Sequence, residues 1–341
     1  MPMAVFLHEK GDPGVLRWEP ITVPRPGPGE VVLRHTAIGV NFADTYHRRG
    51  IDHPWQVPPL PCVLGFEAVG LIKEVGSDVS DFAVGDRVVY GVPPLGAYSE
   101  ERVYPAEHLM KLPASLSDEV AAASFMKGLT AQYLIRRTYA VKPGDWVLVQ
   151  AAAGGMGLIL CQWCKHLGAN VIGTVSTAEK AARAQANGCD YPILYRQEDF
   201  AQRVREITHG EGVHVVYESI GKDTLQKSLD CLRPLGMCAA YGHASGKPDP
   251  IDIINDLGAR GSLFITRPAV MHYMAKREDM VAAASELFEV LASGAVKVQV
   301  NYRYALREVA KAHAAIESGT TMGSTVLLVD EGRGESTNVA N

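Results

Sequence analysis

The stretch WVLVQAAAGGMGLILCQWCKHLG, residues 146–168, decides the fold of this chain. Its first six residues are typical of a strand, three glycines follow at Gly154, Gly155 and Gly157, and the rest has helical character. Because glycine has no Cβ, the backbone can turn tightly there and can approach a pyrophosphate closely. The free N–H groups of the first helical turn attract negative charge. The strand–turn–helix context therefore predicts a dinucleotide-binding turn, and a tight turn without a ligand is the alternative.

Two cysteines in the same stretch, Cys161 and Cys164, suggest a competing interpretation as a metal or redox site. A closed zinc site needs four ligands, however, and the chain has no second Cys or His pair at a suitable spacing. A redox pair of this spacing begins at a helix N-terminus, whereas this pair lies a turn inside the helix. We therefore predict two buried core thiols and, because no secretory signal is recognised, six reduced cysteines in total.

Strand-like and helix-like segments alternate from the glycine turn onward. The predicted strands are residues 146–151, 170–175, 191–195, 213–219, 236–242 and 262–266. Alternation at this spacing is typical of a parallel, doubly wound sheet, so we predict an α/β domain. Residues 262–266 are expected at the sheet edge, where pairing with a second copy of the chain would give a homodimer.

The chain before the turn has a different character, with short β-branched runs between Pro- and Gly-rich turns. Residues 30–41, 68–76 and 86–91 are predicted strands of an antiparallel β domain, and a helical segment from Ser117 stops at Pro143. The last predicted strand, helix and strand, up to Val329, are expected to return to this first domain, which otherwise lacks a helical cover. We therefore predict one domain from residues 1–126 and 301–341 and a second from residues 127–300.

The bulk composition excludes several classes of protein. Of 341 residues, 47% are hydrophobic and 21% are charged, which is typical of a globular chain and not of a disordered one. The net charge of −5 provides no overall basic field, so nucleic acid is an unlikely partner. No apolar run reaches the ~20 residues needed to span a bilayer. We expect a cytoplasmic protein with no membrane partner.

The residues after the second predicted strand of the α/β domain indicate which dinucleotide binds. An NAD site has an acidic residue ~20 residues past the glycine turn, which holds the ribose 2′-OH. This chain has Ser176 at the strand end and Lys180 shortly after it, with Arg183 and Tyr195 expected nearby. A hydroxyl and an ammonium group suit a 2′-phosphate, so NADP(H) is preferred. Glu179 leaves NAD open, and a solvated helix face is the alternative for the cations.

Several blocks of sequence, in order, resemble one family over nearly the whole chain. They are GVNFADTYHRRG (39–50), LGFEAVGLIKEVG (64–76), VGDRVVY (84–90), SFMKGLTAQYLI (124–135) and AAAGGMGLILCQWCKHLGANVIGTV (151–175). The chain resembles the zinc-independent medium-chain reductases of the NADPH:quinone oxidoreductase, or zeta-crystallin, type. The resemblance implies a GroES-like catalytic domain, split in sequence, around a Rossmann domain.

The resemblance also bears on zinc. Related zinc alcohol dehydrogenases carry Cys where this chain has Asn41 and His where it has Phe66. Neither replacement can coordinate Zn²⁺ as a thiolate or an imidazole does, so no metal site is predicted. Without a Lewis acid, a reaction driven by the electron affinity of the acceptor remains, and quinones meet that requirement.

The resemblance implies roles for individual residues. Asn41 and Tyr46 are the implied catalytic pair. The implied NADPH-binding residues are Asn41, Phe42, Tyr46, Lys127, Thr130, Gly154, Gly155, Met156, Gly157, Gly173, Ser176, Lys180, Tyr195, Ser219, Tyr241, Gly242, His243, Phe264, Ile265 and Thr266. The chain departs from the family pattern at two positions. Met156 replaces a small β-branched residue, and Leu194 stands where Asn is common before Tyr195.

The expected reaction is NADPH-dependent reduction of a quinone in the cleft between the two domains. Asn41 and Tyr46 would orient the ring or donate hydrogen bonds to the developing oxyanion, although each could instead be structural. Asp44 is expected to be structural, and residues 47–49 are expected to form a solvated basic rim. The alternatives are reduction of an enone or alkenal double bond, and a non-catalytic protein that binds NADPH or RNA as crystallin-type relatives suggest.

Overall fold

The computed structural model describes residues 1–51 and 59–329. The chain forms two compact units. Unit 1 contains residues 1–123, residues 302–319 and the chain from residue 325, and unit 2 contains residues 124–301 and 320–324. The domain boundaries at residues 126/127 and 300/301 stay a prediction.

Unit 2 contains a sheet of six parallel strands in the order β11-β10-β9-β12-β13-β14. The strands are β9 (Trp146–Val149), β10 (Asn170–Val175), β11 (Tyr191–Leu194), β12 (Val213–Glu218), β13 (Leu232–Ala240) and β14 (Phe264–Thr266). The order runs outward in both directions from β9, which is the doubly wound arrangement of dinucleotide-binding folds. The predicted α/β sheet is therefore confirmed, and β14 lies at its edge as predicted.

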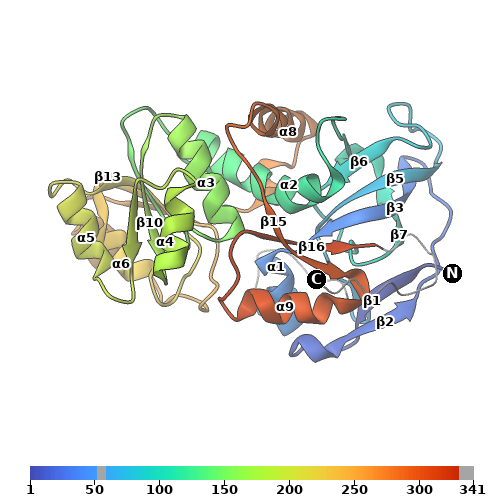
Figure 1. Ribbon diagram of the computed structural model, residues 1–341, viewed down its shortest axis with the longest axis horizontal. Helices are drawn as coiled ribbons and strands as arrows, with labels where there is room; N and C mark the ends of the chain where they lie inside the picture. Colours follow the sequence, from blue (N-terminus) through green and yellow to red (C-terminus); the bar gives the residue numbers. More distant parts are fainter. Residues whose placement is uncertain (52–58, 330–341) are drawn as a thin grey trace. The chain divides into compact units, whose positions relative to one another are not determined.

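Helices connect and cover these strands (Figure 1). They are α3 (Gly155–His166), α4 (Ala178–Gln185), α5 (Phe200–Ile207), α6 (Leu225–Asp230), α7 (Val270–Tyr273) and α8 (Arg277–Ala292), with a π-helical turn at Ile253–Gly258. Helix α2 (Asp118–Tyr133) precedes them and ends in a π-helical turn, Leu134–Thr138. The predicted helix before Pro143 is thus shorter than expected, because the chain leaves helical geometry at Tyr139.

Unit 1 is built on two antiparallel sheets. One has the order β2-β1-β4, and the other has the order β15-β16-β3-β5-β6-β8, with β7 also paired to β3. The strands are β1 (Met3–Leu7), β2 (Leu16–Pro20), β3 (Glu30–Gly39), β4 (Cys62–Val63), β5 (Glu67–Val75), β6 (Arg87–Tyr90), β7 (Glu101–Pro105), β8 (Met110–Lys111), β15 (Val300–Ala305) and β16 (Ser324–Leu328). Because β16 pairs with β3, the last strand does return to the first sheet.

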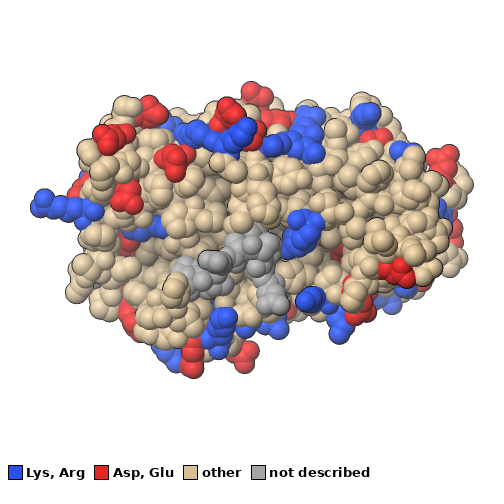
Figure 2. Space-filling model, turned by 180° about the vertical axis from the view of Figure 1, so that it is seen from behind, with Lys and Arg blue, Asp and Glu red and all other residues tan. Residues whose placement is uncertain are grey.

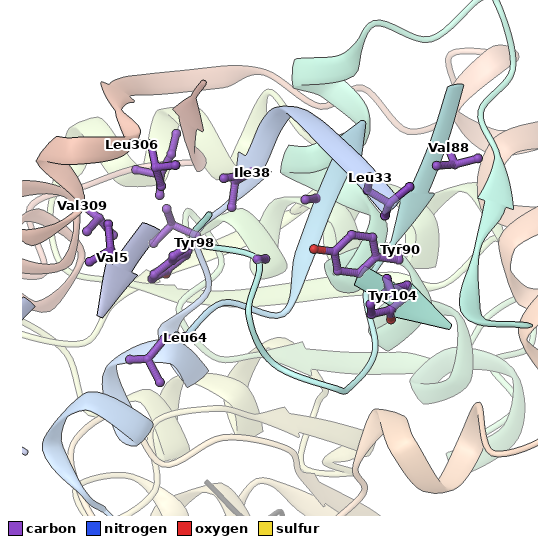
Figure 3. Packing of buried hydrophobic residues seen from close by; sticks show 14 of the residues in the cluster. Val5, Leu33, Ile38, Leu64, Val88, Tyr90, Tyr98, Tyr104, Leu306 and Val309 are labelled. Atoms are coloured by element: carbon purple, nitrogen blue, oxygen red, sulfur yellow. The ribbon is translucent and has the colours of Figure 1, made fainter. Parts of the chain in front are cut away.

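A tightly packed core holds unit 1 together (Figure 3). Its aliphatic residues come from both sheets and from the C-terminal segment, as with Val5 on β1, Leu33 on β3 and Leu306. Tyr90 and Tyr104 stack at 4.1 Å between ring centroids, and the Tyr104 hydroxyl donates to a main-chain carbonyl at 2.7 Å. Burial of apolar surface on this scale is the main force that stabilises such a unit.

Helix α1 (Phe42–Arg49) packs against α9 (Val309–Glu317), and the two lie side by side in Figure 1. The prediction of a solvated rim at residues 47–49 is wrong for His47 and Arg48, which are both fully buried. Arg48 Nη2 donates to both carboxylate oxygens of Glu317, at 2.6 and 2.7 Å. The partner lies 269 residues along the chain, so no local pattern could have indicated it.

Charged side chains on the described surface are of mixed sign. In Figure 2, Lys and Arg side chains are interspersed with Asp and Glu around the visible face. None of the helices within residues 1–51 and 59–329 has the length and apolar character that a membrane span requires.

Candidate functional site

The glycine turn lies between β9 and α3. Gly154 is the N-cap of α3, and Gly155 and Gly157 lie in its first turn. A Cβ on Gly157 would lie 2.7 Å from the Cα atom of Ala152, so a side chain there would collide with the backbone of the turn. A Cβ on Gly154 would meet only the Ala151 carbonyl oxygen, at 3.3 Å. Gly157 therefore permits the helix to pack on the turn, whereas Gly154 keeps the outer surface of the turn open.

A segment remote in sequence, residues 320–324, lines the same turn. The Gly323 N–H donates to the Ala153 carbonyl at 3.0 Å, and Gly323 pairs with Gly154 in a single β-bridge. A Cβ on Gly155 would lie 2.9 Å from Ser324 Oγ. Sequence reasoning missed this segment because it has no recognisable motif.

A buried polar network holds the strand ends beneath the turn. The Thr174 hydroxyl donates to Gln150, and the Gln150 amide donates to Ser228 Oγ at 2.9 Å. Ser228 in turn donates to the fully buried Glu218. Glu218 Oε1 accepts the Ile220 N–H at 2.6 Å and thereby fixes the loop that begins at the predicted site residue Ser219. Sequence reasoning missed this carboxylate.

The residues predicted to hold a 2′-phosphate lie at the ends of β10 and β11. Ser176 follows β10, and Thr177 caps α4 by accepting the Lys180 N–H at 3.2 Å. The Tyr195 N–H donates to the Val175 carbonyl at 3.2 Å, and Tyr195 is 44% exposed. The structure therefore brings Ser176, Lys180 and Tyr195 to neighbouring strand ends.

Two arginines change the set of cations expected around the 2′-phosphate. Burial lowers the pKa of Lys180, and the positive charge of Arg196 lowers it further. Arg196 therefore adds a second cation at this site, which sequence reasoning missed. Arg183, expected nearby, instead donates to Gln299 at 3.1 Å and to Asn301 at 2.9 Å.

Gly173 lies within β10 and is buried. A Cβ there would lie 2.5 Å from the Ala152 Cβ and 2.8 Å from the Cys189 Sγ. Core packing is therefore sufficient to require glycine at this position, and its contact with a cofactor stays a prediction.

The segments after β12, β13 and β14 converge. A Cβ on Gly242 would lie 3.0 Å from the Ser219 Cα, so the two loops touch through their backbones. Arg267 follows Thr266 and donates to the Tyr241 carbonyl at 2.5 Å. The structure thus brings together Ser219, residues 241–243 and residues 264–266, and Arg267 is a residue that the sequence reasoning missed.

His243 belongs to the same group of loops. Its Nδ1 lies 3.4 Å from Arg267 Nη2, and burial together with the charge of Arg267 lowers the pKa of His243. A neutral imidazole is therefore the favoured form near neutral pH. The predicted site residues Lys127 and Thr130 lie on helix α2, which precedes all of these loops in the chain.

The implied catalytic residue Asn41 is the N-cap of α1 and forms a capping box with Asp44. The Asn41 main-chain N–H donates to Asp44 Oδ2 at 2.9 Å, and the Asn41 Nδ2 donates to Glu67 Oε1 at 3.0 Å. Asp44 also accepts the Tyr98 hydroxyl at 2.9 Å, and Tyr98 lies 2.9 Å from His313 Nε2. Asp44 is structural, as predicted, and Glu67 is a partner that the sequence did not indicate.

Phe42 and Tyr46 follow on the same helix. Their ring centroids lie 5.5 Å apart with an edge-on orientation, and Tyr46 is buried. Phe66, at the position of a metal-ligating His in zinc dehydrogenases, packs 5.1 Å from the ring of His47. Burial lowers the pKa of His47 to about 4. Among the described residues, no group of three or more His, Cys, Asp or Glu side chains could hold a metal ion.

The six cysteines are free, and all are buried, as predicted for Cys161 and Cys164. A hydrogen bond with the Cys189 thiol and burial raise the pKa of Cys161, and burial raises the pKa of Cys164. Buried thiols with raised pKa values are poor nucleophiles, so these residues contribute packing.

Comparison with known proteins places both units. Residues 27–114 match the alcohol dehydrogenase GroES-like domain, and residues 155–289 match the zinc-binding dehydrogenase model. The chain is 58% identical over 330 residues to a 2-haloacrylate reductase from Burkholderia sp, covering 96% of this chain and 99% of the relative. It is 45% identical to quinone oxidoreductase 1 of Escherichia coli strain K12, covering 96% of this chain and all of the relative.

Solved structures agree with these relatives. The crystal structure of Escherichia coli quinone oxidoreductase complexed with NADPH matches with a TM-score of 0.92 and 44% identity, over 96% of this chain and 99% of that one. The GroES-like fold predicted for the first part of the chain is therefore confirmed. Together with the full-length identities, these matches show that the chain belongs to the NADPH:quinone oxidoreductase (zeta-crystallin-like) family of zinc-independent medium-chain dehydrogenases and reductases.

Proposed function

We propose that this oxidoreductase uses NADPH to reduce a quinone and that it does so without zinc. The observation that carries the proposal is a glycine turn at the start of α3, followed by Ser176 at the end of β10 and Lys180 on α4, in a chain similar over its full length to quinone oxidoreductases. The cofactor is NADPH, since the 44% identical Escherichia coli enzyme was solved as its NADPH complex.

The residues of unit 2 are proposed to bind the phosphates. The pyrophosphate would lie on Gly154–Gly157, where α3 begins and Gly154 leaves the surface open. Ser176, Lys180, Tyr195 and Arg196 would hold the 2′-phosphate, because a hydroxyl and cations at neighbouring strand ends suit a dianion.

The nicotinamide end is proposed to contact two groups of residues. From unit 1 the group is Asn41 and Tyr46, and from unit 2 it is Tyr241, Gly242, His243, Phe264, Ile265 and Thr266. Further proposed cofactor contacts are Phe42, Lys127, Thr130, Met156, Gly173 and Ser219. NADPH supplies the hydride when bound. The protein orients the acceptor and donates hydrogen bonds to the oxygen that gains negative charge. Asn41 and Tyr46 are the proposed donors, and a proton from water completes the hydroquinone.

Reduction of an activated double bond is a second candidate function. The 58% identity to a 2-haloacrylate reductase favours it, because that relative's name denotes an electron-poor alkene as substrate. Both candidates require the same cofactor and the same hydride donor, so they differ only in the acceptor. A non-catalytic protein that binds NADPH or RNA is the third alternative, and the mixed surface charge in Figure 2 gives no support to RNA binding.

A spectrophotometric assay at 340 nm with purified protein tests the proposal. NADPH or NADH is mixed with 1,4-benzoquinone, 2-chloroacrylate or an enone, with and without a chelator. Quinone-dependent oxidation of NADPH that the chelator does not change is the expected result. Preference for 2-chloroacrylate or the enone would move the substrate class to activated alkenes. No oxidation with any acceptor, despite NADPH binding, would reject both enzymatic candidates.

We also propose a homodimer formed through the edge of the unit 2 sheet. Strand β14 lies at that edge, and Phe264 on it is 55% exposed. An exposed apolar edge strand favours pairing with a second copy. Sedimentation that gives the monomer mass at micromolar concentration would reject this proposal. The cytoplasmic location stays a prediction.

A further inference from the structure

We propose that Glu67 is a positioning residue for the reaction, and that it acts by fixing the orientation of the Asn41 amide. The inference rests on the proposed function, in which Asn41 donates a hydrogen bond to the acceptor. Asn41 and Glu67 lie 26 residues apart in sequence and meet at the start of α1, where Asn41 Nδ2 donates to Glu67 Oε1 at 3.0 Å.

The Glu67 carboxyl group occupies a space that the backbone of unit 1 leaves for it. Glu67 is the first residue of β5 and is fully buried. It pairs with Gly39, the last residue of β3. A Cβ on Gly39 would lie 2.5 Å from the Glu67 carboxyl carbon and would also collide with the Ala122 carbonyl. The absence of a side chain at Gly39 therefore makes room for the carboxyl group beside Asn41.

A carboxylate in this place selects one of the two orientations of an amide. In the reverse orientation, the Asn41 carbonyl oxygen would face Glu67 Oε1, and two acceptors would meet without a proton between them. Asp44 fixes the backbone of the same residue, because the Asp44 main-chain N–H donates to the Asn41 main-chain carbonyl at 3.0 Å and the Asn41 main-chain N–H donates to Asp44 Oδ2 at 2.9 Å. Glu67 therefore specifies the orientation of the amide, and Asp44 fixes the backbone that carries it.

The fixed amide has one donor that is not used by Glu67. An amide nitrogen carries two hydrogens, and Glu67 accepts one of them. The second is then presented in a single direction, which is what a donor to a developing oxyanion requires. Its direction depends on Glu67, because a free Asn side chain would sample both orientations and several rotamers. Supporting hydrogen bonds of this kind hold a site group in its productive geometry.

Two substitutions separate the hydrogen bond from the charge. Glu67→Leu removes the acceptor and should lower kcat roughly tenfold to a hundredfold, with the Kd for NADPH unchanged. Glu67→Gln has the same shape and keeps a carbonyl oxygen as acceptor, so kcat should remain close to the wild-type value. Tyr104→Phe, which removes a buried hydroxyl of the same unit, is the control for loss of stability alone, and its kcat should not change.

A double-mutant cycle with Asn41→Ala decides whether Glu67 acts through Asn41. The expected result is that Glu67→Leu lowers kcat in the wild-type background and leaves it unchanged in the Asn41→Ala background. Equal losses in both backgrounds, a low kcat for Glu67→Gln, or a wild-type kcat for Glu67→Leu would each overturn the inference. If Glu67→Leu does not fold, Glu67→Met, which has a side chain of similar length without an oxygen acceptor, takes its place in the same cycle. Failure of the wild-type protein to reduce any acceptor would instead overturn the proposed function, and the inference with it.

Discussion

The start of α1 in unit 1 and the glycine turn of unit 2 organise their surroundings in opposite ways. The turn depends on missing side chains: Gly157 permits the helix to pack, and Gly154 leaves an open surface. The start of α1 depends on buried polar partners, since Glu67 and Asp44 both hold Asn41. The backbone of Asn41 is held by Asp44, three residues away, whereas its side-chain amide is held by Glu67, 26 residues away.

Acid should have the largest effect and should lower the stability of unit 1, because the described part of that unit contains three buried histidines. Burial lowers the pKa of His47 to about 4 and those of His35 and His313 to about 3. The unfolded chain, with a histidine pKa of ~6.5, binds more protons below that pH, so the free energy of unfolding falls as the pH falls from 6.5 towards 4. Each histidine should remove about 2 kcal/mol at pH 5. Urea unfolding at pH 7 and pH 5 measures the loss.

His35→Gln gives this prediction a matched control. It should reduce the loss of stability between pH 7 and pH 5, because His35 is buried between the Tyr90 hydroxyl and the Ser99 carbonyl. His8→Gln removes an exposed histidine and should leave the loss unchanged. The same pH dependence in both variants would show that the buried histidine does not cause the effect.

Substitutions in the glycine turn test the other region of the comparison, where missing side chains determine the geometry. Gly157→Ala should cost about 1–3 kcal/mol of unfolding free energy, because its Cβ meets backbone atoms of Ala152. Gly154→Ala should cost less than about 1 kcal/mol. Its effect should instead be on the Kd for NADPH, which we expect to rise about tenfold. Thermal unfolding and NADPH fluorescence titration measure the two effects, and wild-type NADPH affinity in Gly154→Ala would move the pyrophosphate away from this turn.

The local parts of unit 2 could be predicted from the sequence. Strand β10 has the predicted bounds of 170–175, and the glycine turn lies where the sequence places it. The strand and the glycine turn can each be predicted from residues within about one strand or one helical turn of them. Strands β1, β2 and β7 were missed because each has only five residues. Strand β1 is apolar throughout and β2 and β7 have mixed polarity, so none of them gives a clear alternating pattern.

The partners of the site residues could not be predicted. Glu67 and Arg267 contact residues 26 positions away in the chain, and Glu218 accepts from Ser228, 10 positions away, so nothing adjacent to them in the sequence marks that role. The burial of Arg48 was missed for the same reason, since a basic run is ordinarily solvated and only Glu317 makes burial possible. The family resemblance provided Asn41 and Tyr46, but it provided no reason for their orientation.

Lys180→Ala tests a site of unit 2 that the sequence did indicate. Loss of the ammonium should raise the Kd for NADPH roughly tenfold to a hundredfold, because a charged hydrogen bond to the 2′-phosphate is removed. The Kd for NADH should not change, since NADH lacks that phosphate. Lys165→Ala removes one positive charge from α3, where Lys165 pairs with Asp190 at 2.6 Å, and serves as the control. Equal losses for NADPH and NADH would place Lys180 outside the 2′-phosphate site.

Tyr46→Phe should have the smallest effect and tests unit 1 alone. The ring of Tyr46 packs edge-on against Phe42 in either form, so removal of the hydroxyl should lower kcat more than it lowers NADPH affinity. If that hydroxyl donates to the acceptor, kcat should fall by up to about tenfold, the value of one neutral hydrogen bond. Steady-state kinetics with the best acceptor measures the change, with Tyr104→Phe as the control for a buried hydroxyl outside the site. An unchanged kcat would leave Tyr46 with a packing role and would place the work of orienting the acceptor on Asn41, whose amide is held by Glu67.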